Sequence, residues 1–262
     1  MASTALITGA SGGIGREIAT ILASEGCDCV LVARDASKLA ELARTLEAAH
    51  GVRTLAIDLD LSADDAPARL LEQLERGGLP AVDILINNAG FATFGLFAQT
   101  ELAAEIGELH LNVVTLTVLT KLLLPGMLAR RRGEIMNVGS TGSFISGPYM
   151  ATYCATKNYV LSFSEALAEE VRGTGVSVTC LCPGPTASGF QERAGMAESP
   201  LVKNAKMPDA HSVAAFGVKA MHAKKILAIP GAGNQIVPLL VRLLPRGVIP
   251  RIVRRAQAPR AR

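Results

Sequence analysis

Short apolar runs and longer amphipathic stretches alternate along most of the chain. The first apolar run, Thr4–Thr8, passes through a glycine-rich stretch into a helical pattern over Arg16–Ser24. Later runs of the same kind predict strands at Asp28–Ala33, Val52–Ile57, Ala81–Ile86, Glu134–Val138, Val176–Leu181 and Ile226–Ile229. Apolar strands between helices are typical of a parallel sheet that is covered on both faces. The pattern therefore predicts an α/β protein built on a doubly wound parallel sheet of about seven strands.

The helical patterns have their apolar positions three and four residues apart. They predict helices at Ala36–Ala49, Ser62–Arg76, Gln99–Ala129, Tyr149–Arg172 and Asp209–Lys225. Asn112 lies inside the longest of these, where asparagine is unfavourable, so we expect a kink or a bound water there. Pro125 predicts a bend or a break near the end of the same helix. The polar stretch Ala187–Pro208 follows a strand and is interpreted as a substrate loop or, alternatively, as a plain surface loop.

The C-terminal residues 235–262 differ in composition from residues 1–234, which we expect to form a single domain. They combine a stripe of Leu, Val and Ile with many arginines, and they contain no acidic residue. The arginines are Arg242, Arg246, Arg251, Arg254, Arg255, Arg260 and Arg262. A basic amphipathic segment of this kind can lie on an anionic membrane or in the apolar groove of a partner. The alternative is a helix that docks on its own domain with its arginines in solvent.

Composition argues against several classes of protein. A net charge of +3 over 262 residues gives no basis for binding nucleic acid. The cysteines lack the spacing of a zinc site, so we expect buried reduced thiols and no bound metal. The apolar runs predict neither a signal peptide nor a membrane-spanning helix. We therefore expect a cytoplasmic protein, with peripheral membrane contact through the basic C-terminal segment as a further possibility.

A glycine-rich turn joins the first strand to the first helix. Its pattern is Thr8-Gly9-x-x-x-Gly13-x-Gly15, which differs from the G-x-G-x-x-G of many dinucleotide sites. Backbone N–H groups at such a helix start can bind a pyrophosphate, and glycine lets the ligand approach closely. Taken by itself, the stretch is also compatible with a structural turn that binds nothing.

Polar residues follow the next strands at the edge of the sheet where ligands bind. Arg34 suits a 2′-phosphate, whereas Asp35 precedes a helical pattern and is interpreted as its N-cap rather than as a ribose ligand. This favours NADP(H) over NAD(H). Asp58 is expected either to contact the adenine or to lie in a turn. Asn87 and Asn88 follow a buried strand and are expected to brace the sheet or the cofactor crevice.

Tyr153 and Lys157 are four residues apart in a helical pattern, which places the phenol and the ammonium on one face. A nearby cation favours the phenolate, so Lys157 is expected to lower the pKa of the phenol towards the working range. Ser140 stands at the end of an apolar strand, from which its hydroxyl could reach the same point. Taken alone, the Tyr-x-x-x-Lys spacing favours a packed aromatic residue and a solvated lysine, because this spacing is common in any helix.

Together these motifs resemble those of the short-chain dehydrogenase/reductase family. The matching pieces run in order to about residue 190 and are the glycine turn, Asn87-Asn88-Ala89-Gly90, Asn112, Ser140, Tyr153-x-x-x-Lys157 and Pro183-Gly184. The resemblance implies a Rossmann-type sheet and a nicotinamide cofactor, and it extends to a broad branch of NADP-dependent members.

The resemblance also implies a role for each matched residue. Tyr153 would act as the general acid or base, Lys157 would lower its pKa and bind the nicotinamide ribose, and Ser140 would hydrogen-bond the substrate oxygen. Asn112 would hold a water that links Lys157 to a proton relay. The implied cofactor-binding residues are Gly9, Ser11, Gly13, Ile14, Gly15, Arg34, Asp58, Leu59, Asn88, Ala89, Gly90, Tyr153, Lys157, Pro183, Gly184 and Thr186.

The sequence thus predicts an NADP(H)-dependent oxidoreductase that transfers a hydride between the nicotinamide and a small carbonyl or secondary alcohol substrate. Two alternatives remain open. One is a non-catalytic NADP(H)-binding sensor or scaffold, and the other is the same reductase acting on lipid-like ketones at a membrane surface. A homodimer or homotetramer is expected.

Overall fold

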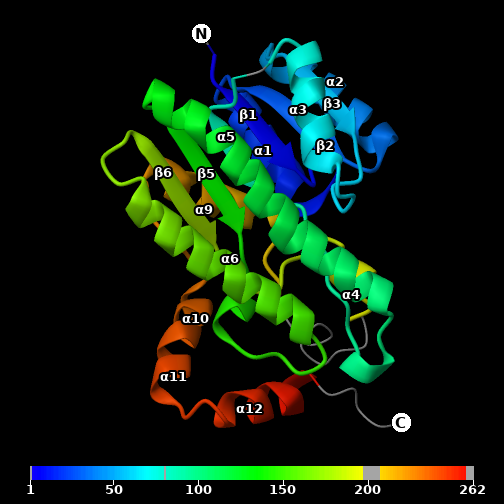
Figure 1. Ribbon diagram of the computed structural model, residues 1–262, viewed down its shortest axis with the longest axis vertical. Helices are drawn as coiled ribbons and strands as arrows, with labels where there is room; N and C mark the ends of the chain where they lie inside the picture. Colours follow the sequence, from blue (N-terminus) through cyan, green and yellow to red (C-terminus); the bar gives the residue numbers. More distant parts are fainter. Residues whose placement is uncertain (1, 80, 197–206, 258–262) are drawn as a thin grey trace.

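Seven parallel strands form one sheet at the centre of the protein (Figure 1). The computed structural model describes residues 2–79, 81–196 and 207–257. The order across the sheet is β3-β2-β1-β4-β5-β6-β7, and every neighbouring pair is parallel. The strands are β1 (Thr4–Thr8), β2 (Asp28–Ala33), β3 (Thr54–Asp58), β4 (Ile84–Asn87), β5 (Gly133–Val138), β6 (Val176–Leu181) and β7 (Leu227–Ala228). The predicted doubly wound α/β sheet is confirmed.

Helices cover both faces of the sheet. On one face lie α1 (Gly13–Ser24), α2 (Ala36–His50) and α9 (Ala210–His222), and on the other lie α3 (Ala66–Arg76), α5 (Leu116–Arg130) and α6 (Ala151–Glu170). Figure 1 shows α5 and α6 across the near face, with α9 behind the sheet. Successive strand residues enter opposite cores: Ile7 packs on the α1 side and Leu6 on the α3 side. Both faces are therefore dry, which is why the strands are apolar at consecutive positions.

The start of α2 shows how local sequence sets a boundary. Asp35 caps the helix, because its Oδ1 accepts a hydrogen bond from the Lys38 N–H at 3.1 Å. The same carboxylate lies 2.9 Å from Lys38 Nζ. The helix ends at Gly51, whose φ of 66° is in the left-handed region that glycine tolerates. The interpretation of Asp35 as an N-cap is confirmed.

The predicted helix Gln99–Ala129 is divided into segments. A 3-10 turn, η1 (Phe97–Gln99), precedes α4 (Leu102–Leu109), and a π-helical segment, η2 (His110–Thr115), joins α4 to α5. Asn112 lies in the π-helical segment, so the irregularity expected at this residue is confirmed. Helix α5 continues past Pro125 to Arg130, so the chain does not break at the proline.

The helical run Leu102–Arg130 is long and apolar enough to cross a membrane, and it is the one such run among the described residues. This was not expected, because polar residues interrupt its apolar stretches. Leu119, Leu123 and Met127 of its second half are buried in the core against the sheet. Length and composition are therefore compatible with a core helix in this case, although the same features also occur in membrane-spanning helices.

All five cysteines are buried and unbridged, as predicted. Cys27 and Cys29 lie in the core on the α1 side of the sheet, so their side chains share one face. Cys180 and Cys182 share a face at the end of β6, with their sulfurs 3.6 Å apart.

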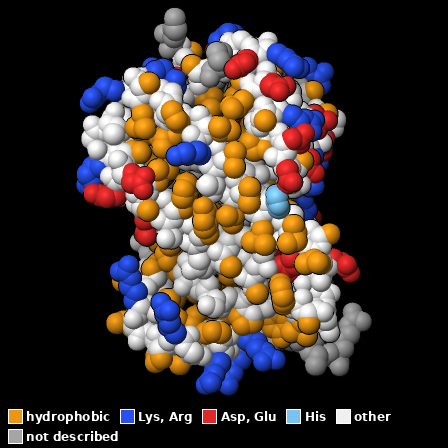
Figure 2. Space-filling view, in the orientation of Figure 1, with side chains coloured by type: hydrophobic (Ala, Val, Ile, Leu, Met, Phe, Trp, Pro, Cys, Tyr) orange, Lys and Arg blue, Asp and Glu red, His pale blue; other side chains and the backbone are white. Residues whose placement is uncertain are grey.

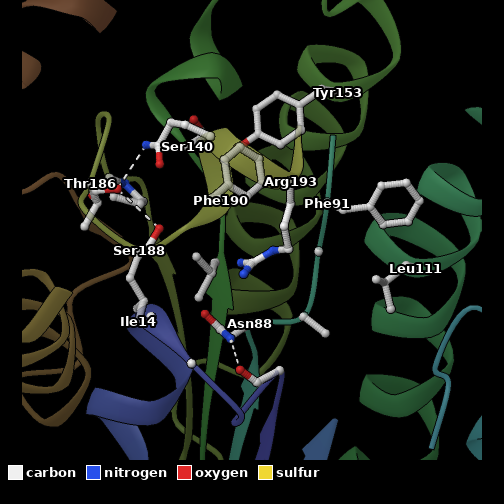
Figure 3. Close-up of a pocket in the computed structure, with 18 of the residues that line it drawn as sticks. Ile14, Asn88, Phe91, Leu111, Ser140, Tyr153, Thr186, Ser188, Phe190 and Arg193 are labelled. Carbon is white, nitrogen blue, oxygen red and sulfur yellow. Dashed lines mark hydrogen bonds between the residues drawn. The ribbon is translucent and has the colours of Figure 1, made fainter. Parts of the chain in front are cut away.

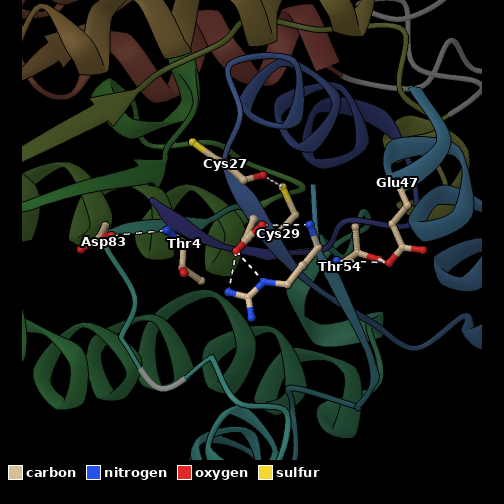
Figure 4. A network of polar contacts seen from close by, with 8 residues as sticks. Thr4, Cys27, Cys29, Glu47, Thr54 and Asp83 are labelled. Carbon is tan, nitrogen blue, oxygen red and sulfur yellow. Dashed lines mark hydrogen bonds and ion pairs between the residues drawn. The ribbon is translucent and has the colours of Figure 1, made fainter. Parts of the chain in front are cut away.

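Polar contacts join the strands at their amino ends, on the edge away from the site (Figure 4). The Thr4 N–H donates to Asp83 Oδ2 at 3.3 Å, and Thr54 Oγ1 donates to Glu47 Oε1 at 2.6 Å. Asp28 is buried and accepts hydrogen bonds from the Arg53 guanidinium at 2.9 and 2.7 Å. These contacts satisfy the polar groups that a covered sheet would otherwise bury alone.

The C-terminal residues form three short helices below the domain, α10 (Ala232–Gln235), α11 (Val237–Leu243) and α12 (Val248–Gln257) (Figure 1). We call α10 to α12 the C-terminal arm. The predicted substrate loop contains α7 (Phe190–Arg193), and a bridge between Ala187 and Asp209 closes its base. Residues 197–206 of that loop lie outside the described residues.

Candidate active site

A large cleft opens at the carboxyl ends of the strands, where β1 and β4 lie side by side. Strands on either side of this point connect in opposite directions, and ligands of doubly wound sheets bind there. The cleft has a volume of about 1390 Å³, whereas pockets for one small ligand measure roughly 300–1,000 Å³. It therefore has room for two molecules side by side. Figure 3 shows Asn88 at its base and Tyr153, Ser140 and Phe190 at the other end.

The glycine turn forms the floor of the cleft below α1. Gly9 and Gly13 have φ values of 69° and 54°, which non-glycine residues rarely adopt. A Cβ on Gly15 would lie 2.4 Å from both Gly9 O and Asn88 Nδ2, so no side chain fits at this position. Gly15 lies beneath the floor and does not line the cleft, whereas Gly9 and Gly13 do.

Helix α1 begins at the floor of the cleft without a side-chain cap. Its N-cap is Gly12, which has no side chain to bind the first N–H groups. Ser11 and Ile14 line the cleft on either side of this helix start. Uncapped N–H groups and the positive end of the helix dipole favour an anion here.

The tandem asparagines after β4 have separate tasks. Asn87 is buried, and its Nδ2 donates to Asn137 Oδ1 at 2.8 Å and to Thr120 Oγ1 at 3.0 Å. Asn88 lines the cleft, and its Nδ2 donates to Thr8 O at 2.9 Å. Asn87 therefore braces β4 against β5, while Asn88 holds the glycine turn against the end of β4. Ala89 and Gly90 continue the same wall.

The rim beyond β2 and β3 is charged. Arg34 and Lys38 are exposed and line this part of the cleft. Asp58, expected near the adenine, does not line the cleft, whereas Leu59 and Asp60 do. Asp58 is the last residue of β3, the strand at the edge of the sheet, and is exposed. The contact of Asp58 with the adenine stays a prediction, and Asp60 is a further carboxylate at this rim.

Ser140, Tyr153 and Lys157 meet at the opposite end of the cleft, as predicted. Ser140 caps the 3-10 turn η3 (Thr141–Phe144), and its Oγ accepts a hydrogen bond from the Gly142 N–H at 3.0 Å. Tyr153 and Lys157 project from one face of α6, where Lys157 Nζ lies 5.7 Å from the centroid of the Tyr153 ring. The phenol packs beside Phe190, whose ring centroid is 5.5 Å away.

The ionisation of this pair differs from the expectation. Burial raises the pKa of the Tyr153 phenol, and a hydrogen bond with Ser140 offsets only part of this effect. Burial also lowers the pKa of Lys157 to about 8. Lys157 Nζ donates to Val138 O at 2.7 Å. Burial outweighs the lowering of the tyrosine pKa that was expected from this lysine. A phenol that keeps its proton at neutral pH is suited to donating it.

Asn112 lies behind the cleft rather than in its wall. Its side chain is buried, donates to Phe91 O at 3.0 Å and Thr156 Oγ1 at 3.2 Å, and accepts from the Phe91 N–H at 3.2 Å. A Cβ on Gly90 would lie 2.9 Å from Asn112 Oδ1 and 3.5 Å from Lys157 Nζ. Asn112 and Lys157 therefore flank the same small space next to Gly90, and the π-helical turn delivers Asn112 to it.

The turn after β6 closes the cleft from the side. Its lining residues are Pro183, Gly184, Pro185, Thr186 and Ser188. Thr186 is buried and donates to Gly184 O at 2.9 Å, and Ser188 Oγ donates to Thr186 O at 3.2 Å. A Cβ on Gly184 would lie 2.7 Å from the Asn234 side chain of the C-terminal arm, so the arm packs closely against this turn.

Two buried carboxylates beside the site were not predicted. Glu108 Oε2 accepts from the Thr93 N–H at 2.9 Å and from Thr93 Oγ1 at 3.0 Å. Glu105 Oε1 accepts from Thr93 Oγ1 at 2.9 Å and from Thr100 Oγ1 at 2.7 Å. Burial raises the pKa of Glu108 to about 7. Acidic residues of an amphipathic helix are normally expected on its solvent side. The only feature of the sequence that could have indicated this buried pair is the spacing of three residues between the two acids in an otherwise apolar helix.

Arg193 and Gln257 also line the cleft without having been predicted. Arg193 projects from α7 towards the middle of the cleft beside Phe190 (Figure 3). Gln257 is the last residue of α12 and reaches the cleft from the C-terminal arm, where its Nε2 lies 3.9 Å from Met150 Sδ. No local pattern could identify these two residues. They belong to segments that are distant along the chain and reach the cleft only when the chain folds.

Comparison with known proteins identifies the family of the chain. The model of the short chain dehydrogenase family matches residues 3–199. The ketoacyl reductase HetN of Nostoc sp. is 34% identical over 244 residues, which cover 92% of this chain and 82% of that protein. A very-long-chain 3-oxoacyl-CoA reductase of Mycosarcoma maydis is 40% identical over 185 residues, covering 69% of this chain. The match spans only about half, 52%, of that fungal relative.

Solved structures resemble the whole chain. A short-chain dehydrogenase from Sphingobium yanoikuyae in complex with NADPH has a TM-score of 0.83 and 29% identity, over 99% of this chain and 98% of that one. A short-chain dehydrogenase/reductase from Burkholderia phymatum in complex with NAD has a TM-score of 0.80 and 26% identity, over 100% and 97% of the two chains. With its sheet, its glycine turn and its Ser-Tyr-Lys site, the chain belongs to the short-chain dehydrogenase/reductase family of oxidoreductases.

Proposed function

We propose that the protein is an NADP(H)-dependent carbonyl reductase that also oxidises the corresponding secondary alcohols. The observation that carries this proposal is the convergence of Ser140, Tyr153 and Lys157 in one cleft with the glycine turn. The names of the two relatives, a ketoacyl reductase and a 3-oxoacyl-CoA reductase, support reduction as the working direction.

The cleft fits a dinucleotide. A pyrophosphate would bind at the uncapped start of α1, where glycine leaves the backbone accessible. Arg34 and Lys38 at the rim favour a 2′-phosphate, and the carboxylate of Asp35, which would compete for a ribose, is held in the helix cap. These contacts support NADP(H) over NAD(H). The bound cofactor would supply the hydride.

The protein residues handle the oxygen and its proton. Ser140 and Tyr153 would hold the substrate carbonyl oxygen, and the protonated phenol would donate its proton as the alcohol forms. The Lys157 ammonium would stabilise the charge that this transfer leaves on the phenol oxygen. Asn112, next to Lys157 across Gly90, would hold a water that returns the proton.

The cellular setting and the assembly belong to the same proposal. Five buried free thiols suit a reducing compartment such as the cytoplasm. The substrate is a small-molecule carbonyl compound or alcohol rather than a macromolecule. Apolar side chains exposed on α4 and α5 support a homodimer, and Leu102 is the most exposed of them.

Replacement of Tyr153 by Phe tests the proposal. Removal of the proton donor should lower kcat for ketone reduction about a hundred- to ten-thousand-fold, while NADPH binding, followed by its fluorescence, stays unchanged. Tyr159→Phe is a matched control in the same helix, since its hydroxyl contacts Thr117 away from the cleft. Full activity of the Tyr153→Phe protein would refute the assignment. NADPH binding with no NADPH oxidation across a ketone and aldehyde screen would favour the sensor alternative.

A further inference from the structure

Helix α11 carries an apolar stripe on its outer side. Ile236, Leu239, Leu240 and Leu243 are 51%, 61%, 51% and 82% exposed. Their spacing of three, four and seven residues places them on one helical face. Val237 and Val241 on the other side are half-buried. A helix that used its apolar side only to pack on its own domain would not expose the larger stripe.

Helix α12 has a basic outer side and a buried inner side. Ile249 and Gln257 are buried eight residues apart, and Gln257 lines the cleft. The outer residues Arg251, Arg254 and Arg255 are exposed together with Ile252. The inner side therefore anchors α12 to the end of the cleft near Met150, and the arginines face away from the domain.

The outer face of α11 and α12 is basic, and no acidic residues lie near it in the sequence. From Ala210 to Gln257 the sequence contains no Asp or Glu. Arg242 and Arg246 add two exposed charges between the helices, and within the described residues no ion pair involves any of the five arginines of this face. Figure 2 shows Lys and Arg side chains beside hydrophobic ones along the lower edge, over α11 and α12.

The positive charge and the apolar stripe together indicate which kind of partner this face can bind. A second copy that packed face to face across a two-fold axis would bring the same arginines together, which costs free energy. A bilayer with anionic lipids accepts leucines at its acyl boundary and arginines among its headgroups.

We propose that α11 and α12 form a docking face for anionic membranes. Because α12 also supplies Gln257 to the cleft, docking would hold that end of the cleft at the lipid surface. Ile145, Met150, Phe190 and Met196 line this end and make it apolar. If the proposed reductase function holds, the preferred substrates are ketones with long apolar chains that partition into the membrane.

Vesicle flotation tests the docking face directly. The purified full chain is mixed with phosphatidylcholine vesicles that contain or lack phosphatidylserine. We expect binding only to the anionic vesicles. Each arginine near such a surface strengthens partitioning about fivefold, so Arg251→Gln/Arg254→Gln/Arg255→Gln should bind roughly a hundredfold more weakly. Leu239→Ser/Leu243→Ser should also lose most of the binding.

The control variant removes three arginines elsewhere. Arg44, Arg69 and Arg76 lie on the exposed sides of α2 and α3, so their replacement by Gln gives the same change in net charge. This variant should bind like the wild type. Equal loss in the control, equal binding to neutral vesicles, or no binding at all would overturn the proposal. Conversion of a wild-type dimer to a monomer by the leucine substitutions, without vesicle binding, would identify a self-interface instead.

An activity assay separates docking from catalysis. The arm variants should reduce acetophenone in solution like the wild type but lose at least tenfold in kcat/KM for a palmityl methyl ketone in anionic vesicles. Equal rates of wild type and variants on the vesicle substrate would refute membrane delivery. Absence of any ketone reduction by the wild type would refute the proposed function, whereas flotation would still decide the docking face.

Discussion

Lys157 is buried at the end of the cleft with one observed hydrogen bond, to Val138 O. An ammonium in this environment loses its hydration, which lowers its pKa from 10.5 to about 8. The same burial raises the pKa of Tyr153. The two residues are thus ready for proton donation at neutral pH, with a charged lysine beside a neutral phenol.

The pH dependence of reduction should follow Lys157. As the pH rises through about 8, the lysine loses its charge and no longer stabilises the phenolate that forms on proton donation. We expect kcat/KM for ketone reduction to be constant below this pH and to fall by up to about tenfold per pH unit above it. Lys157→Arg stays charged and should abolish the fall, although its kcat is lower. A wild-type profile that is flat up to about pH 10 would contradict this assignment.

Arg34 at the rim should decide between the two nicotinamide cofactors. A charge-assisted contact with a 2′-phosphate contributes about 1.5–3 kcal/mol, so Arg34→Ala should weaken NADPH binding roughly ten- to hundredfold and leave NADH nearly unchanged. Calorimetric titration of both cofactors measures this. Lys38→Ala is an instructive comparison, because Lys38 lies on the same rim but pairs with Asp35. An equal loss for NADPH and NADH would argue against the 2′-phosphate contact.

Among the elements, α4 has the most unusual interior. It carries Glu105 and Glu108, both buried, on the side that faces Thr93. The next turn is π-helical and places Asn112 beside Lys157. Two buried acids and an irregular turn lower the stability of a helix. Because they lie beside the proposed reacting groups, we infer that they serve the site rather than the stability of the fold.

Glu108 should make stability depend on pH. Its pKa is raised from 4.5 in the unfolded chain to about 7 in the folded protein. The folded state binds more protons between these values, so the free energy of unfolding falls as the pH rises through this window. The difference amounts to about 3 kcal/mol. Glu108→Gln does not titrate and should therefore gain stability relative to the wild type from about pH 5 to about pH 8.

Urea denaturation at the two pH values checks this prediction. Glu101→Gln, exposed at the start of the same helix, should show no comparable gain. A difference between Glu108→Gln and wild type that is independent of pH would mean that Glu108 keeps an ordinary pKa.

At the scale of the whole molecule, two apolar surfaces stand out among the described residues. One lies on α4 and α5, where Leu102, Ile106 and Leu122 are exposed, and the other is the outer stripe of α11. The first carries fewer basic residues than the second and suits a second copy of the chain, as proposed above. The second is bordered by arginines and suits a membrane. A single protein can therefore use both surfaces at once.

A charge in the first surface should disrupt the proposed dimer. Ile106→Asp/Leu122→Asp would bury carboxylates at a two-fold contact, so we expect a shift to monomer in sedimentation velocity. Leu239→Ser/Leu243→Ser, which alters only the arm, should keep the wild-type mass. A mass that stays the same in both variants would exclude α4 and α5 as the contact.

Much of this architecture could be predicted because it depends on local patterns. Apolar runs predicted all seven strands, and the cap at Asp35 and the irregularity at Asn112 were foreseen from single residues. The predicted boundaries differ from the observed ones at several elements. For example, β4 begins at Ile84 instead of Ala81, and α3 begins at Ala66 instead of Ser62. Strand ends depend on neighbouring strands, and for this reason β3 begins and ends later than its apolar run predicted.

The sequence alone determined the order of strands and helices along the chain, because hydrophobic period and helical spacing are properties of adjacent residues. It also predicted Ser140, Tyr153 and Lys157 as site residues, through their motifs and the family resemblance that these carry. Tertiary structure decided the rest. It buried Tyr153 and Lys157 and shifted their pKa values, brought Glu108 to Thr93, and inserted Gln257 into the cleft. It also turned the leucines of α11 outward. Burial and the meeting of distant segments arise only when the chain is packed, so no local pattern records them.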